Sequence, residues 1–163
     1  MTPNEALKTD PLRGRLSSAL GAHVSLRGIR MQFPDRTREI EIHRAAARQL
    51  RERGDYAGAR SSYFKWVESV RQQNINSGGS LEQDLREAKQ EYSEFVKTDP
   101  LYMQIRDAIT KKTGEKPGIL QTELYTTLPQ FEKTDIQYAL YFMDDHRAIV
   151  RIKKGRTYSL SLP

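Results

Sequence analysis

Three breaks divide the central part of the chain into segments of helical length, and this punctuation constrains the fold more than any other feature. The breaks are Gly54-Asp55, the run from Asn74 to Gly79, and Thr98-Asp99-Pro100. Glycine suits the end of a helix, aspartate suits its beginning, and the residue before a proline avoids helical angles. The pattern predicts a unit of three helices, at 36–53, 56–73 and about 80–97.

Apolar side chains in these segments recur at steps of three and four residues, the spacing of one buried helix face. Asp55 is placed to cap the second helix, and Ser80 with Gln83 has the spacing of a capping box for the third. Gly54 is placed to end the first. We expect a core of Ile40, Ala47, Leu50, Tyr56, Ala59, Tyr63, Phe64, Val67, Val70, Leu85, Ala88, Tyr92 and Phe95.

The composition fits a folded chain that favours polyanions. Of 163 residues, 37% are hydrophobic, and 27 Lys and Arg against 21 Asp and Glu give a net charge of +6. The absence of cysteine excludes a disulfide framework, a thiol nucleophile and thiolate metal sites. Because no apolar run is long enough for a bilayer or a signal peptide, we expect a cytoplasmic protein with no membrane partner.

Residues 1–35 are predicted to form an N-terminal arm that is mildly basic. The first 21 residues are rich in Pro, Gly, Ser and Thr, which favours a loose segment around one short helix. Farther on, apolar and polar residues alternate, with a change of phase at Gly28 that a bulged strand would allow. This pattern predicts a short strand carrying Val24, Leu26, Ile29, Met31 and Phe33.

The last sixty residues have a different order of elements, and we place a domain boundary before them, at 98–100. An amphipathic helix at 101–112 is followed by a short helix at 121–128, which Pro129 ends. A third helix, at 135–146 and capped by Thr134, is expected to bury Ile136, Ala139, Leu140 and Met143. Two short strands then follow, at 148–153 and 156–160, joined by a tight hairpin.

This order, with Leu140, Met143 and Asp144 followed by Ala148-Ile149, resembles a winged helix-turn-helix domain over residues 100–162. One position departs from that pattern, because Arg147 stands where such domains commonly place a glycine with a left-handed backbone angle. The resemblance implies a recognition helix in the major groove of DNA and a cationic hairpin, the wing, on the phosphates. The implied DNA-binding residues are Thr134, Gln137, Tyr138, Tyr141, Arg151, Lys153, Lys154 and Arg156.

The segment 36–98 carries a second resemblance. Ala47, Leu50, Gly54, Tyr56, Ala59 and Tyr63 stand at the spacing of one tetratricopeptide helix-turn-helix repeat. A microtubule-interacting-and-transport domain is an equally fair comparison, and a plain three-helix bundle stays open because solenoid repeats normally need three copies. The resemblance implies a unit that dimerises or recruits a partner.

The predicted recognition helix also carries an aromatic face. Opposite its buried stripe lie Tyr138, Tyr141 and Phe142, which we expect to be exposed. No Lys or Arg occurs between 134 and 146, whereas three aspartates do, and these would repel a phosphate backbone. The alternative interpretation is therefore a protein interface at these three aromatic residues, or their packing against the helical unit.

Catalytic and ligand-binding patterns are weak. The three histidines, His23, His43 and His146, are far apart, and none has a partner at metal-ligand spacing. Asp144, Asp145 and His146 are adjacent on a helix and so diverge by about 100 degrees each. We expect no enzyme activity, metal, cofactor or small-molecule ligand.

The sequence thus predicts a mainly α protein with a small β wing, a three-helix tetratricopeptide-like unit followed by a winged helix. Its predicted function is that of a non-enzymatic adaptor or transcriptional regulator that binds double-stranded DNA. The first alternative is a protein–protein interaction module, with a protein partner or self-association through the aromatic face. An accessory subunit of a nucleic-acid-processing machine is a third, weaker option.

Overall fold

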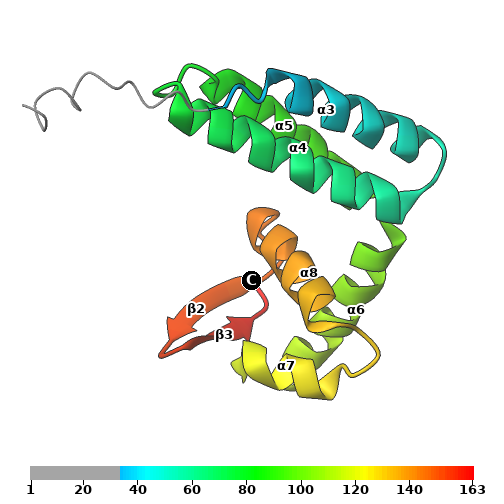
Figure 1. Cartoon of the computed structure of the whole chain (residues 1–163). Helices are drawn as coiled ribbons and strands as arrows, with labels where there is room; N and C mark the ends of the chain where they lie inside the picture. The colour runs from blue at the N-terminus through cyan, green and yellow to red at the C-terminus, as the bar shows by residue number, and fades with distance from the viewer. Residues whose placement is uncertain (1–33) are drawn as a thin grey trace, which may run out of the picture. The chain divides into compact units, whose positions relative to one another are not determined.

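The computed structural model describes residues 34–163, of which Asp35–Pro163 form one compact unit. This unit is mainly helical with a small β part, as predicted (Figure 1). The sheet has three antiparallel strands, one more than the predicted hairpin. The arm at 1–33, with the strand predicted at Val24–Phe33, lies outside the described residues. None of the helices within 34–163 is both long and apolar enough to cross a bilayer.

The first half of the unit consists of the three predicted helices, α3 (Thr37–Glu52), α4 (Tyr56–Asn76) and α5 (Glu82–Val96). Gly54 follows α3 with a φ of +75°, the left-handed angle expected of a glycine after a helix. The Asp55 carboxylate accepts a hydrogen bond of 2.9 Å from the Gly58 amide and caps α4. The α3–α4 turn therefore has the chemistry that the sequence predicts.

Two predicted caps are wrong. Leu81 is the N-cap of α5, and the Ser80 hydroxyl donates to the Ser77 hydroxyl at 2.6 Å rather than closing a capping box. The start of α5 is instead tied to α4, since Asn74 Oδ1 accepts a hydrogen bond from the Leu81 amide at 2.8 Å. Likewise α8 (Lys133–Asp145) begins one residue before Thr134, with Glu132 as its N-cap.

The core of this half confirms most of the predicted face. Ala47, Ala59 and Tyr63 are fully buried, and all four predicted positions of α5 are buried. The predicted burial of Phe64 is wrong, because 57% of its surface is exposed. Trp66, only 4% exposed, points into the core instead. Residues 63, 64, 66 and 67 are all apolar, so either Phe64 or Trp66 could belong to a buried helical face, and spacing alone did not separate them.

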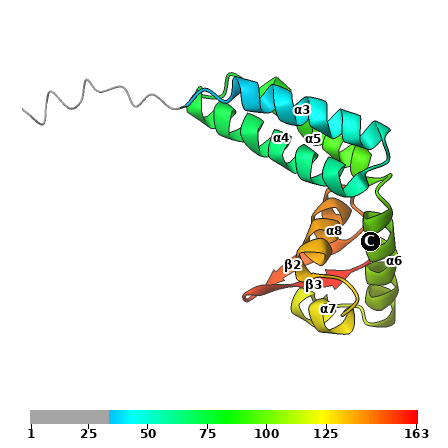
Figure 2. The same ribbon diagram turned by 45° about the vertical axis from the view of Figure 1, so that its right-hand side comes forward.

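The second half begins with α6 (Pro100–Glu115), then β1 (Ile119–Leu120), α7 (Gln121–Thr127) and α8 (Figure 1 and Figure 2). The strands β2 (Val150–Lys154) and β3 (Thr157–Ser161) close the chain as the predicted hairpin. β3 lies between β1 and β2, and both pairings are antiparallel. β1 was not predicted from the sequence, because a segment of two residues is too short to show alternation.

The inner stripe of α8 is confirmed: Ile136, Ala139, Leu140 and Met143 are all fully buried. Arg147 follows α8 with a φ of +57°, so this arginine adopts the left-handed angle that a glycine would take more readily. The Ala148 amide donates to the Met143 carbonyl at 2.7 Å and fixes the turn. Apolar side chains from both halves join in one hydrophobic core.

Candidate nucleic-acid interface

The candidate interface starts from the β2–β3 hairpin, whose turn is set by one glycine. Lys154 pairs with Thr157, which leaves Gly155 and Arg156 as a two-residue loop. Gly155 has a φ of +62°, whereas Arg156 is not among the described residues with positive φ. Positive φ at the first loop residue alone is the type II′ pattern, which matches the twist of the flanking strands. The turn therefore presents Lys154 and Arg156 at the tip.

Three of the four wing cations are open to solvent. Lys153, Lys154 and Arg156 are exposed, and none forms an ion pair within the part of the chain that the structure describes. Exposed cations without carboxylate partners can neutralise phosphates without first breaking an internal pair.

Arg151 differs from the other three. Its partner across the strands is the fully buried Leu160, so its side chain lies on the core side of the hairpin. The guanidinium donates to Gln121 Oε1 at 3.0 Å, lies 3.6 Å from Asp144 Oδ2, and stacks 4.3 Å from the Tyr158 ring centroid. Its side chain is only 18% exposed. Arg151 and Lys153 share a face, as predicted, but Arg151 is engaged in holding α7, α8 and the sheet together.

On α8, the structure separates the residues that the sequence analysis grouped. Thr134 and Gln137 are exposed, and the Gln137 amide donates to the Tyr125 hydroxyl at 3.3 Å. Tyr141 is 55% exposed, but Phe142 is only 4% exposed, so its predicted exposure is wrong. Tyr138 is partly buried. The two tyrosines of the predicted aromatic face therefore lie in different surroundings.

The cause of this burial is packing of α8 on the first helical unit. The Phe142 ring meets the Tyr92 ring of α5 edge-on, with centroids 4.8 Å apart. Tyr92 in turn stacks on Tyr63 of α4 at 5.6 Å. Edge-to-face and offset contacts at such distances are favourable beyond the area they bury. Two interpretations were open for the aromatic face, a protein interface or packing against the helical unit. Phe142 packs against the helical unit.

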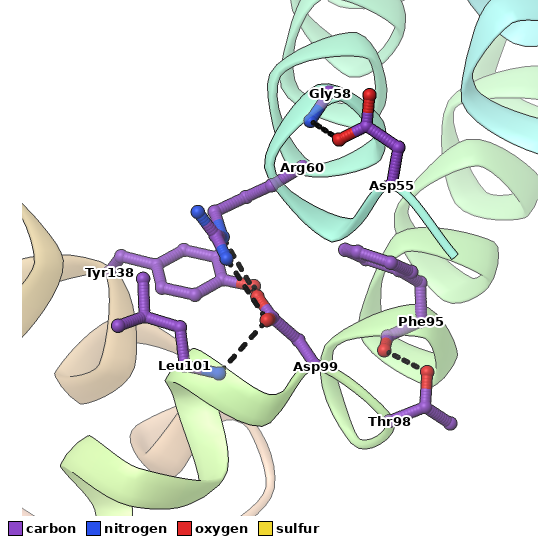
Figure 3. Close-up of polar contacts among 8 residues, drawn as sticks. All are labelled: Asp55, Gly58, Arg60, Phe95, Thr98, Asp99, Leu101 and Tyr138. Carbon is purple, nitrogen blue, oxygen red and sulfur yellow. Dashed lines mark hydrogen bonds and ion pairs between the residues drawn. The ribbon is translucent and has the colours of Figure 1, made fainter. Parts of the chain in front are cut away.

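A buried polar network joins the same elements (Figure 3). The Asp99 carboxylate, fully buried, accepts two hydrogen bonds from Arg60 of α4, at 2.8 and 3.0 Å, and one from the Tyr138 hydroxyl at 2.9 Å. It also accepts from the Leu101 amide at 3.1 Å, as the N-cap of α6. Burial, together with the negative charge of Asp99, raises the pKa of Tyr138, which therefore stays protonated and donates.

This network was missed, although its signal was present. Thr98-Asp99-Pro100 was interpreted only as a break, but aspartate followed by proline is also a typical N-cap and first residue of a helix. Nothing in the sequence links that carboxylate to Arg60, 39 residues earlier. The segment 98–100, where a domain boundary was predicted, is thus also a point of contact between α4, α6 and α8.

His146 lies at a second polar junction, between α5, α6 and the end of α8. Its Nε2 is 2.6 Å from the Ser93 hydroxyl, and its Nδ1 is 3.2 Å from the Tyr102 hydroxyl. Ser93 Oγ also lies 3.2 Å from Asp145 Oδ2. Burial, reinforced by the positive charge of Lys97, lowers the pKa of His146 below its usual value.

The lowered pKa predicts a pH-dependent stability. The unfolded chain binds a proton at His146 more tightly than the folded chain does. As far as His146 is concerned, the free energy of unfolding therefore has its full value above the unfolded pKa, about 6.5. It should fall as the pH is lowered below that value. Urea midpoints at pH 7.5 and pH 5 would measure the fall, and His146→Gln is expected to reduce it. An identical fall in the variant would contradict this assignment.

Within residues 34–163, no three His, Asp or Glu side chains gather as metal ligands would. Searches of protein-family models, of curated proteins and of solved structures found no match to this chain.

Proposed function

We propose that this protein is a non-enzymatic DNA-binding adaptor or transcriptional regulator that holds the phosphate backbone of double-stranded DNA with its wing. In this proposal residues 100–162 form a winged helix-turn-helix, and residues 36–98 form a tetratricopeptide-like unit. The order α6, β1, α7, α8, β2, β3, with β3 central in the sheet, supports the first assignment. The turn at Gly54 and the buried pair Ala47 and Ala59 support the second.

The observation that carries the proposal is the hairpin tip with its three exposed cations, Lys153, Lys154 and Arg156. Lys153 and Lys154 point to opposite faces of β2, so the tip offers positive charge on both sides. Arg151, anchored on Gln121 and Tyr158, supports the base of this hairpin. In the proposal, the wing supplies affinity. On α8, the exposed Thr134, Gln137 and Tyr141 are available for contacts with DNA, whereas Tyr138 donates to Asp99.

The proposal predicts a salt-dependent affinity that depends on the wing. Each phosphate contact contributes about 0.9 to the slope of log affinity against log salt concentration. Replacing two wing cations, in Lys153→Gln/Lys154→Gln, is therefore expected to reduce the slope by about 2 and to weaken binding at low salt. Fluorescence anisotropy with a random-sequence duplex over a series of salt concentrations measures both quantities.

A matched control separates the wing from net charge. Lys89→Gln/Lys111→Gln removes two exposed lysines from α5 and α6, which are remote from the hairpin in sequence and unpaired in the described chain. This control is expected to keep the wild-type slope. Equal losses in the two variants would remove the wing from the mechanism.

The second candidate function, a protein-interaction module, is favoured by exposed apolar side chains. Tyr141 on α8 and Ile152 on β2 are 55% and 62% exposed, respectively. Single exposed apolar residues are common, so this surface supports the second candidate less strongly than the cations support the first. Absence of DNA binding at low salt would favour the interaction module.

A further inference from the structure

A groove between α3 and α5 lies outside the wing and its proposed function. It encloses about 320 Å³, with Trp66 and Val70 of α4 at its floor and Ile40 of α3 at its side. This volume is at the lower end of the range for ligand pockets. Trp66 and Val70 are part of the hydrophobic core and are only 4% and 1% exposed, so the floor of the groove is apolar but almost closed.

The two walls of the groove carry opposite charges in unequal number. On α5, four carboxylates line it at steps of three, four and three residues, namely Asp84, Glu87, Glu91 and Glu94. This spacing keeps them on one face of the helix. On α3, the groove is lined by Arg44 and Arg48. In a chain whose net charge is positive, this groove has an excess of negative charge.

One arginine of the protein already occupies part of the groove. Arg48 reaches from α3 to Glu91 of α5 through two hydrogen bonds, at 3.0 and 2.8 Å. Its guanidinium also lies 5.7 Å from the centroid of the Trp66 ring, within the range of a cation–π contact. Arg48 thus shows how this groove binds a guanidinium, by a bidentate pair of hydrogen bonds to a carboxylate and a contact with the face of an indole ring.

The remaining carboxylates have no such partner. Asp84, Glu87 and Glu94 form no ion pair with the described chain, and Glu87 and Glu94 accept only from glutamines one helical turn away. Their stripe extends over about 15 Å, or three helical turns. A duplex or a membrane of anionic lipid would be repelled here, whereas a cationic segment would be attracted.

We propose that this groove binds a cationic helical segment of a partner protein. Arginine or lysine side chains of the segment, three and four residues apart, pair with Asp84, Glu87 and Glu94. An apolar side chain beside them packs against Ile40, the partly exposed apolar side chain at the side of the groove. The site is separate from the wing, so the protein can engage this partner and a polyanion through different surfaces.

The test uses an alanine-based helical peptide with arginines three and four residues apart and leucines beside them, and the same peptide with glutamates in place of the arginines. Trp66 is the only tryptophan of the chain, so its emission reports directly on the groove. We expect the cationic peptide to bind the full chain and to change this emission, and the acidic peptide to do neither. Fluorescence anisotropy of the labelled peptides gives the affinities.

The decisive variant is Asp84→Asn/Glu87→Gln/Glu94→Gln, which is expected to weaken binding by about tenfold, as the loss of three partly screened ion pairs implies. The control, Glu41→Gln/Glu52→Gln/Glu132→Gln, removes the same charge from exposed positions outside the groove and is expected to change the affinity less than twofold. Circular dichroism checks the fold of both. Absence of binding, equal losses in the two variants, or binding that leaves the Trp66 emission unchanged would overturn the proposal.

Discussion

Replacing Asp99 with alanine is expected to lower the free energy of unfolding by about 3–5 kcal/mol, the usual cost of removing one partner of a buried ion pair. The reason is that this single carboxylate has three tasks. It neutralises Arg60, accepts from the Tyr138 hydroxyl and caps α6 (Figure 3). Because the Arg60 side chain is 22% exposed, water can solvate part of the orphaned charge, so the lower end of the range is expected.

Urea denaturation followed by circular dichroism measures this effect. Asp107→Ala is the matched control, because Asp107 is an exposed aspartate of α6, the helix that Asp99 caps, and within residues 34–163 it pairs only with the adjacent Arg106. The control is expected to change the free energy of unfolding by no more than about 0.5 kcal/mol. Similar losses for the two variants would show that Asp99 does not hold α4, α6 and α8 together.

The second large effect separates two neighbours on α8. Phe142→Ala is expected to lower the free energy of unfolding by about 3–5 kcal/mol, because it leaves a cavity between α8 and α5 where the ring now meets Tyr92. Tyr141→Ala, one residue earlier, is expected to cost no more than about 1 kcal/mol, since 55% of Tyr141 is exposed.

The same denaturation experiment distinguishes the two packing arrangements of α8. If α8 stood away from the helical unit with an open aromatic face, the two substitutions would have similar small costs. A small cost for Phe142→Ala would therefore contradict the packing of α8 on α5, whatever the behaviour of the wing.

Local signals in the sequence predicted most helices and the hairpin. Gly54, Asp55 and Pro129 act within a few residues, and the inner stripe of α8 follows from the helical period alone. β1 was not predictable in this way, because its two residues become a strand only by pairing with Leu160 and Ser159. Phe64 and Trp66 show the same limit, since contact with other helices decides which side chain points inward.

The candidate interface was predictable in part for a related reason. Alternation placed Arg151 and Lys153 on one face of a strand, and this is correct. Which face meets the core depends on Leu160, in the other strand, and on Gln121, in α7. Residue spacing carries no information on that contact, so the anchored arginine could not be distinguished from the exposed lysines beside it.

The Asp99 carboxylate also affects how this protein can be dissected. A fragment starting at residue 100 would lack both Asp99 and Arg60, and also α5. It would uncover the Tyr138 hydroxyl and the Phe142 ring, which bond to Asp99 and pack on Tyr92 in the intact chain. Such a truncated protein would expose an aromatic surface that the truncation itself creates. Measurements of specificity on that fragment would then describe a surface that the whole molecule does not expose.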